Sequence, residues 1–218
     1  MFEAVNFKIR NNNFLLNSSR CIFWQEQKML ILSDLHLGKA GHFRKNGIAI
    51  PQTIFKADMH KLISVIQFNK PESVVIVGDL FHSSENKEHD FFLKWRNDFP
   101  NLQIHLVKGN HDILKDKAYQ KANLTIHEHS LSIKGFSFTH DINHCDTATD
   151  YCFSGHIHPG ISISGAARQS LKVPCFYFTT NHAVLPAFGN FTGIFPVKPS
   201  VGDTVFAIAD NTVIKIFG

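Results

Sequence analysis

The amino-acid sequence predicts an α/β protein that contains a parallel β-sheet, with a second sheet packed on the first. Three apolar runs, at residues 29–32, 73–77 and 102–107, have the composition of buried strands. Residues 51–68 and 86–99 lie between these runs and show the spacing of helices. Strand, helix, strand, helix, strand is the order of βαβ units, whose strands run parallel. The C-terminal half shows only short strands, which predict the second sheet.

The chain enters the first parallel strand through residues 4–24, where apolar and polar residues alternate and Asn-rich segments supply turns. We expect short antiparallel strands there. Residues 38–47 contain three glycines and three basic residues, so an exposed loop near the site is expected. Pro51 is predicted to open the next helix, because the first helical position needs no N–H donor, and this helix should run to about Phe68.

Short strands are predicted throughout the C-terminal half. They are expected at 131–133, 136–138, 151–154, 161–163 and 173–178. Residues 185–193 form a loop punctuated by glycine and proline, and residues 205–209 and 212–217 make a closing hairpin across Asp210 and Asn211. Because no internal repeat, low-complexity tract or linker interrupts the chain, we expect one domain over residues 1–218.

Composition is typical of a globular protein of one domain. The 218 residues are 44% apolar and only 18% charged, below the usual charged fraction of about a quarter, which argues against disorder. No apolar run approaches the ~20 residues of a membrane helix, and no signal peptide is evident, so a cytoplasmic protein is expected. The net charge of +4 mildly favours anionic partners. The four cysteines form no C-x-x-C pair, so we expect them to be reduced and buried.

Polar residues of metal-binding type follow the apolar runs, where α/β sheets collect their ligands. These strand-end residues are Asp34, His36, Asp79, Asn110, His111, His140, His156 and His158. Carboxylate, imidazole and amide groups together suit borderline divalent ions such as manganese, iron or zinc, and the absence of neighbouring cysteines argues against a structural zinc site. The set is too large for one ion, whereas two ions sharing a bridging carboxylate would use it fully.

The order of these residues matches a known family. The motifs are D-x-H at 34–36, G-D at 78–79, G-N-H-D at 109–112, the lone His140 and G-H-x-H at 155–158. In this order they resemble the calcineurin-like metallophosphoesterase superfamily. The resemblance implies a four-layer α/β/β/α sandwich with two mixed sheets, and a reaction in which a metal-bridging hydroxide attacks phosphorus.

The resemblance also implies a role for each residue. One metal ion would be held by Asp34, His36, Asp79 and His158. The second would be held by Asp79, Asn110, His140 and His156, so that Asp79 bridges the two. His111 would bind no metal and would donate a proton to the leaving oxygen or stabilise its charge.

His82 departs from the pattern of many superfamily members. Phosphomonoesterases and phosphoprotein phosphatases usually carry an acid three residues after the bridging aspartate, and here that position is His82, in G-D-L-F-H. Double-strand-break repair nucleases of the superfamily resemble this variant, with a histidine near that of G-N-H-D. We therefore expect a catalytic role for His82, with a helix-capping or core histidine as the alternative.

Longer sequence segments point to one family within this superfamily. They are D-L-H-L-G-K, F-R-K-N-G-I-A-I-P, G-D-L-F-H, G-N-H-D, G-H-I-H-P, P-C-F-Y-F and L-P-A-F-G-N-F-T-G. Together they resemble the small bacterial metallophosphoesterases called ligase-associated DNA-damage-response endonucleases (PdeM-like). The resemblance implies a DNA substrate and DNA-repair proteins as partners. We expect a two-metal phosphodiesterase, a nuclease acting on DNA with Mn²⁺, or with Fe or Zn. The alternatives are a nucleotide phosphodiesterase or phosphatase, and a scaffold that keeps the fold without metals.

Other polar residues near the motifs have two interpretations each. Lys39, Arg44 and Lys45 either hold a phosphate backbone beside the site or belong to a solvated loop. Asp112 and Asp141 each follow a proposed site histidine, and either orient an imidazole or cap a local turn.

Overall fold

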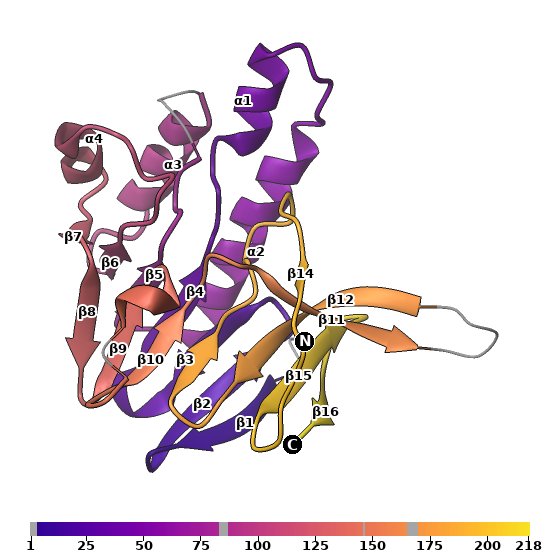
Figure 1. Cartoon of the computed structure of the whole chain (residues 1–218). Helices are drawn as coiled ribbons and strands as arrows, with labels where there is room; N and C mark the ends of the chain where they lie inside the picture. The colour runs from indigo at the N-terminus through magenta and orange to yellow at the C-terminus, as the bar shows by residue number, and fades with distance from the viewer. Residues whose placement is uncertain (1–3, 83–86, 146, 165–169) are drawn as a thin grey trace.

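Two mixed β-sheets stacked face to face form the centre of the protein (Figure 1). The computed structural model describes residues 4–82, 87–145, 147–164 and 170–218. The predicted α/β class with two mixed sheets is confirmed. No helix in these ranges is long and apolar enough to cross a membrane.

The first sheet has seven strands in sequence order, antiparallel from β1 to β4 and parallel from β4 to β7. The strands are β1 (Ala4–Ile9), β2 (Asn12–Asn17), β3 (Cys21–Trp24), β4 (Met29–Ser33), β5 (Ser73–Val77), β6 (Gln103–Val107) and β7 (Thr125–His127). All residues of β4 and β5 are buried, as expected for central strands covered on both faces. The expected antiparallel entry and all three expected parallel strands are confirmed.

The second sheet has nine strands in the order β14-β11-β12-β13-β10-β9-β8, with β15 paired to β12 and to β16. The strands are β8 (Ser130–Ile133), β9 (Phe136–Thr139), β10 (Tyr151–Ser154), β11 (Pro159–Ser164), β12 (Ser170–Phe178), β13 (His182–Val184), β14 (Phe195–Pro196), β15 (Thr204–Ala209) and β16 (Thr212–Phe217). The predicted closing hairpin is confirmed, since Asp210 and Asn211 adopt the positive φ angles of a two-residue turn.

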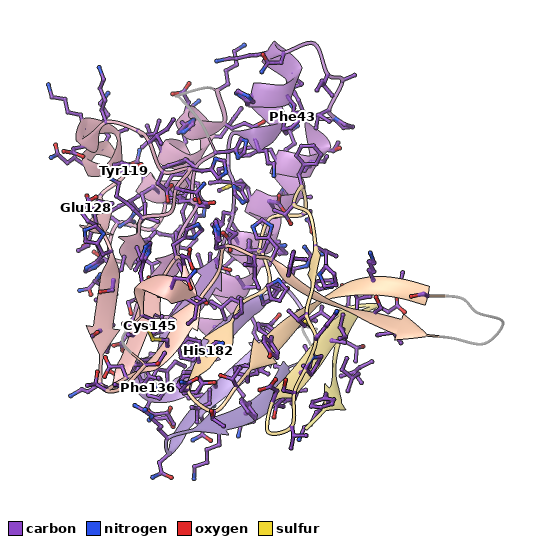
Figure 2. The ribbon with its side chains drawn as sticks, viewed as in Figure 1. Phe43, Tyr119, Glu128, Phe136, Cys145 and His182 are labelled. Carbon is purple, nitrogen blue, oxygen red and sulfur yellow. A yellow bond between two sulfur atoms is a disulfide. The ribbon has the colours of Figure 1, made fainter. Side chains whose placement is uncertain are left out.

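The helices are α1 (Lys39–Lys45), α2 (Thr53–Asn69), α3 (Lys87–Asn97) and α4 (Asp116–Lys121), with single turns η1 (Gln25–Gln27) and η2 (Ile142–His144). Helices α2, α3 and α4 pack on the outer face of the first sheet, whereas α1 lies above α2 at the top of the view (Figure 1). One core joins these helices to the sheet through residues such as Leu62, Phe92 and Leu32. A second core, rich in phenylalanine, fills the space between the sheets; Phe136 points into it from β9 (Figure 2). Burying one such ring contributes roughly 1.5–3 kcal/mol.

Three expectations need correction. Residues 38–47 do not form a loop, because α1 occupies Lys39–Lys45. The second helix begins at Thr53, so Pro51 precedes the helix instead of opening it. The short helix α4 was not expected at all. Asn86, the expected start of the third helix, lies outside the described residues.

The cysteines also differ from expectation. The structure joins Cys145 to Cys152 in a disulfide, so the expectation of reduced thiols is wrong for this pair (Figure 2). Cys21 and Cys175 are free and buried, as expected. The disulfide ties the turn after η2 to strand β10.

Candidate metal centre

The expected ligands lie on sharp turns that follow buried strands. Five of them adopt left-handed backbone conformations with positive φ: Asp34, His36, Asp79, His156 and His158. Such a conformation costs a non-glycine residue about 1 kcal/mol or more, and it persists only where surrounding structure imposes it. Here the main chains of the first two turns hold each other, because the amides of Asp34 and His36 donate to the carbonyls of Gly78 and Asp79 (3.2 and 2.8 Å). The strain is therefore concentrated where the side chains converge.

One cluster joins Asp34, His36 and His158. The Nε2 atoms of His36 and His158 lie 3.3 Å apart, and Nε2 of His158 lies 3.6 Å from Oδ1 of Asp34. Potential ligand atoms of all three side chains lie within 4.8 Å of one another. Asp34 is fully buried and His36 is nearly so, which leaves this donor group little access to bulk water.

A second cluster joins Asp34, Asp79 and His140. His140 places Nδ1 3.8 Å from Oδ1 of Asp34 and Nε2 3.6 Å from Oδ2 of Asp79. Two further expected ligands meet the same imidazole nitrogen, because Oδ1 of Asn110 lies 3.0 Å from His140 Nε2 and Nδ1 of His156 lies 2.9 Å from it. The structure thus brings all seven expected metal ligands into one centre.

Asp79 lies between the two groups of histidines. Its Oδ2 is 3.6 Å from His140 Nε2 and 3.8 Å from His36 Nε2. A carboxylate in this position can reach both halves of the centre, as a bridging ligand must. Asp34 is also shared, since it belongs to both clusters.

The donor set fits two divalent ions. Oδ1 of Asp34 and Nδ1 of His140 are buried and have no hydrogen-bond partner, and a buried polar atom without a partner is costly. Imidazole nitrogens and carboxylate oxygens that face one another at 3–4 Å are acceptors gathered around the same space. Cations placed among them would satisfy these atoms and offset the desolvation of two buried carboxylates.

Electrostatics favours the metal-binding form of His36. Burial lowers the pKa of His36 to about 3, so this imidazole stays neutral and keeps a lone pair for a metal at physiological pH. Burial raises the pKa of Asp79, while the neighbouring His140 opposes that rise. Although burial alone would raise the pKa of Asp34, the histidines around it, His158 first, lower it.

Two motif glycines allow the ligands to approach the backbone. A Cβ atom on Gly155 would overlap the carboxylate of Asp34, and one on Gly109 would overlap the carboxylate of Asp79. The glycines of G-H-x-H and G-N-H-D are therefore required by close packing against the two shared carboxylates. The amides beside them complete the cradle, since the N–H of His156 donates to Asp34 (3.1 Å).

Asp112 fixes the loops that carry the ligands. Its buried carboxylate accepts hydrogen bonds from the amides of Leu80 (3.3 Å), Phe81 (2.9 Å) and Gly109 (3.0 Å). It therefore joins the turn after β5 to the turn after β6, and burial raises its pKa to about 7. Asp141 behaves differently, because it caps η2 by accepting the amide of Asn143 (2.9 Å). Local capping is thus the correct alternative for Asp141.

Comparison with known proteins identifies the family. The family model for calcineurin-like phosphoesterases matches residues 27–156. The chain belongs to this family. It is a metal-dependent phosphoesterase, and the expected superfamily is confirmed. No curated protein matches the chain.

One solved structure shares the fold of this chain over nearly its whole length. The structure of the Pseudomonas putida nuclease MPE is 22% identical in sequence and superposes with a TM-score of 0.83, covering 98% of this chain and 100% of that one. A protein of unknown function from Aquifex aeolicus, AQ665, is 17% identical, with a TM-score of 0.45 over 60% of this chain and 78% of that one. The first match shows that the architecture of this phosphoesterase extends over nearly the whole chain.

The two histidines expected to act in catalysis lie side by side at the phosphoesterase centre. The rings of His82 and His111 stack with centroids 4.5 Å apart, and each centroid is 5.4 Å from that of His36. The amide of His111 donates to Oδ1 of Asp79 (2.9 Å), which anchors the residue to the proposed bridge. Burial and the neighbouring His111 lower the pKa of His82 to about 4.

The three basic residues of α1 do not share a surface. Lys39 is half-buried near the centre, where burial lowers its pKa although Asp79 and Asp34 raise it. Arg44 turns away and binds Glu88 of α3 (2.7 Å) and the carbonyl of Ile50 (3.1 Å). Lys45 is exposed. The structure therefore leaves Lys39 as the one of these three basic residues beside the centre.

A groove of 360 Å³ beside the phosphoesterase centre contains residues that sequence reasoning did not assign. It is lined by Asn110, His140 and His156 together with Lys108, His129 and His144. Lys108 directly precedes G-N-H-D, and this adjacency was the available signal in the sequence. His129 belongs to none of the motifs, and its place on this groove depends on the turn after β7.

Proposed function

We propose that this phosphoesterase is a two-metal phosphodiesterase that cleaves DNA, with Mn²⁺ in its centre and Fe or Zn as alternatives for the same ligands. The observation that carries the proposal is the pair of His/Asp clusters that share Asp34, with Asp79 between their histidines. Oxygen and imidazole ligands without thiolates suit manganese and iron as well as zinc.

These contacts support the ligand roles that the family resemblance implies. Asp34, His36, His158 and Asp79 would hold one ion, and Asp79, Asn110, His140 and His156 the other. When bound, such a pair of ions lowers the pKa of water to supply a nucleophile and neutralises charge on the phosphoryl oxygens. The chain itself fixes the ligands through the backbone contacts between the two turns and through Asp112.

His111 is proposed to protonate the leaving oxygen. Its position is supported by the hydrogen bond from its amide to Asp79 and by its stacking on His82. Stacking restricts rotation of the His111 ring, so the imidazole is held in one orientation beside the centre. His82 would act on the reaction by this contact and by keeping the position free of negative charge.

DNA as the substrate is supported by two observations. The fold extends end to end over a nuclease structure, and a histidine replaces the acid that monoesterases carry at position 82. The resemblance to ligase-associated endonucleases also supports DNA-repair proteins as partners. The alternative, a phosphodiesterase or phosphatase for nucleotides, is favoured by a different observation: α1 presents only Lys39 to the centre, which is few cations for a polymer.

Hydrolysis of a substrate panel tests the proposal. Metal-stripped protein reloaded with Mn²⁺ should cleave single-stranded or duplex DNA and an aryl phosphodiester faster than an aryl phosphomonoester or a cyclic nucleotide. An Asp34→Ala variant purified in the same way controls for contaminating nucleases, and it should be inactive. Preference for cyclic nucleotides, with DNA left intact, would support the alternative and overturn the assignment of DNA.

A further inference from the structure

A large groove opens between α1, α2 and α3, outside the metal centre. It has a volume of 790 Å³, within the range of natural ligand pockets. Its apolar wall comes from Phe55, Met59 and Ile63 of α2 and from Phe91 and Trp95 of α3. Phe91 is 55% exposed although its ring centroid lies 6.0 Å from that of Phe55, so an aromatic edge of this wall is open to solvent.

The groove runs along α2 for about three helical turns. Its lining residues on and just before this helix extend from Gln52 to Ile63, about 16 Å at about 1.5 Å per residue. Within this length the lining residues recur at intervals of three and four, which gives α2 a continuous face toward the groove. A cavity of this length and openness matches a short helical segment of another protein.

The rim of the groove is basic. Lys45, Lys56 and Lys87 line it from three different helices, and all three are exposed. The single carboxylate among the described lining residues is that of Glu88, which is buried and already bound by Arg44 at 2.7 Å. The positive charges of these three lysines are therefore not neutralised by a carboxylate among the described residues that line the groove.

We infer that this groove, defined by the apolar wall and by Lys45, Lys56 and Lys87, binds an acidic amphipathic helix of a partner protein. Apolar side chains of that helix would cover Phe91 and Met59, and its Asp or Glu residues would meet the lysines. A second copy of this chain is a poorer occupant, because the chain carries a net charge of +4. A nucleic-acid strand is also a poorer occupant, because the wall offers it mostly aliphatic and aromatic surface.

The short helix α1 lies between the groove and the metal centre. Arg44 and Lys45 line the groove from one side of α1, whereas Lys39 lies near Asp34 and Asp79 of the centre. A partner helix in the groove would thus contact the element that also carries Lys39. The binding surface is nevertheless distinct, because the described lining residues include none of the expected metal ligands.

Selection from a phage-displayed library of random 16-residue peptides on the intact protein tests this inference. Enriched peptides should carry apolar residues at helical spacing flanked by Asp or Glu. Their affinity, measured by fluorescence polarisation of a synthetic copy, should fall by about tenfold or more for Phe91→Ala and for the double variant Lys56→Glu/Lys87→Glu. Phe68→Ala, at a residue with the same 55% exposure, and Lys117→Glu/Lys172→Glu should bind as wild type does.

Circular dichroism and hydrolysis of an aryl phosphodiester should show that all four variants are folded. No enrichment, enriched peptides without acidic residues, or affinity unchanged by the groove variants would overturn the inference. So would self-association of the wild type that the groove variants abolish, which would make a second copy the occupant. Loss of DNA binding in Lys56→Glu/Lys87→Glu without any effect on peptides would assign the groove to the polymer.

Discussion

The proposed role of His111 as a proton donor depends on its contacts with Asp79 and His82. It is anchored to Asp79 through its amide and stacked on His82, yet the ligand clusters do not include it. Replacing His111 by Gln should therefore preserve metal binding and reduce kcat on DNA by roughly 10²–10⁴-fold, the usual effect of losing a proton donor. The loss should be much smaller on an aryl phosphodiester, whose leaving group needs little protonation.

Steady-state kinetics on both substrates, with metal content measured in parallel, checks this prediction. His60→Gln, on the exposed face of α2, is the matched control and should have little effect. Equal losses on good and poor leaving groups would contradict proton donation and indicate a binding role for His111.

His82 places a neutral side chain where many superfamily members carry a negatively charged one. Its pKa of about 4 means that it is neutral at physiological pH, where an aspartate or glutamate would be negative. We expect diesters to be cleaved well above monoesters, and His82→Asp to shift the ratio of kcat/KM toward monoesters. The measurement compares aryl diester with aryl monoester for both proteins, and His82→Asn serves as the control for loss of the ring alone. A wild type that prefers simple monoesters would disprove the nuclease-like interpretation of G-D-L-F-H.

At the scale of residues, the convergence of the candidate ligands was predictable and their supporting contacts were not. Asp34, His36 and Asp79 follow apolar runs in a fixed order, so their types and spacing were sufficient. The role of Asp112 depends on amides of the preceding turn, about thirty residues earlier, and no local pattern reveals it. Arg44 was grouped with Lys39 on sequence proximity alone, but its partner Glu88 comes from α3.

We expect different functions for two basic residues of α1, Lys39 and Arg44, because their contacts differ. Lys39 is near the centre, so Lys39→Ala should flatten the plot of log K against log salt for DNA binding by about 0.7–0.9. Arg44→Ala should leave that slope unchanged but destabilise the fold, because the buried carboxylate of Glu88 loses the guanidinium that it pairs with at 2.7 Å. Binding titrations at several salt concentrations and thermal melts separate the two effects. A flattened slope for Arg44→Ala with unchanged stability would contradict this division.

The helix α2 fastens the loop of residues 185–193 over the first metal motif. Asp58 accepts both the amide and the side chain of Asn190 (3.1 and 2.7 Å), and Lys61 donates to the carbonyl of Phe188. The loop in turn bonds the end of β4 and the residue after it, since the amides of Phe188 and Gly189 donate to the carbonyls of Ser33 (2.8 Å) and Asp34 (3.1 Å). Asp58 also pairs with the largely buried Lys61, whose Nζ lies 3.8 Å from Oδ1 of Asp58. Asp58→Ala should therefore lower the free energy of unfolding by about 3–5 kcal/mol, the usual effect of removing one partner of a buried ion pair.

Denaturant unfolding of metal-free protein checks this value, and metal titration should show weaker affinity as well. Asp90→Ala, on an exposed position of α3, is the control and should change stability by no more than about 0.5 kcal/mol. An Asp58→Ala protein as stable as the wild type would show that the loop is held by other contacts.

At the scale of elements, the strands were more predictable than the short helices. The segments that form β4, β5 and β6 are continuous apolar runs, so the local sequence already favours a buried strand at each of them. Gly41 within α1 lowers helix propensity by about 1 kcal/mol relative to alanine, so the sequence favours a loop there. Contacts made only after folding, between Arg44 and Glu88 and between the amide of Gly38 and Glu88 (2.9 Å), stabilise the helix instead.

The whole molecule holds the centre at one edge where both sheets meet. Turns after β4, β5 and β6 of the first sheet and after β9 and β10 of the second sheet each supply candidate ligands (Figure 1). The α/β class and the second sheet could be predicted from strand order and length. The packing of the second sheet on the first was also expected, but the residues that fill the space between them were not, because that core depends on contacts between residues more than a hundred positions apart, such as Phe14 with Phe136 and Phe153.

A calorimetric titration of metal-free protein with Mn²⁺, supported by elemental analysis, is the most direct test of a two-metal centre bridged by Asp79. We expect two ions per chain for the wild type and for the control Asp116→Ala on α4, and loss of most of both ions in Asp79→Ala. A wild type that binds a single ion, or an Asp79→Ala protein that still binds two, would contradict a two-metal centre bridged by Asp79.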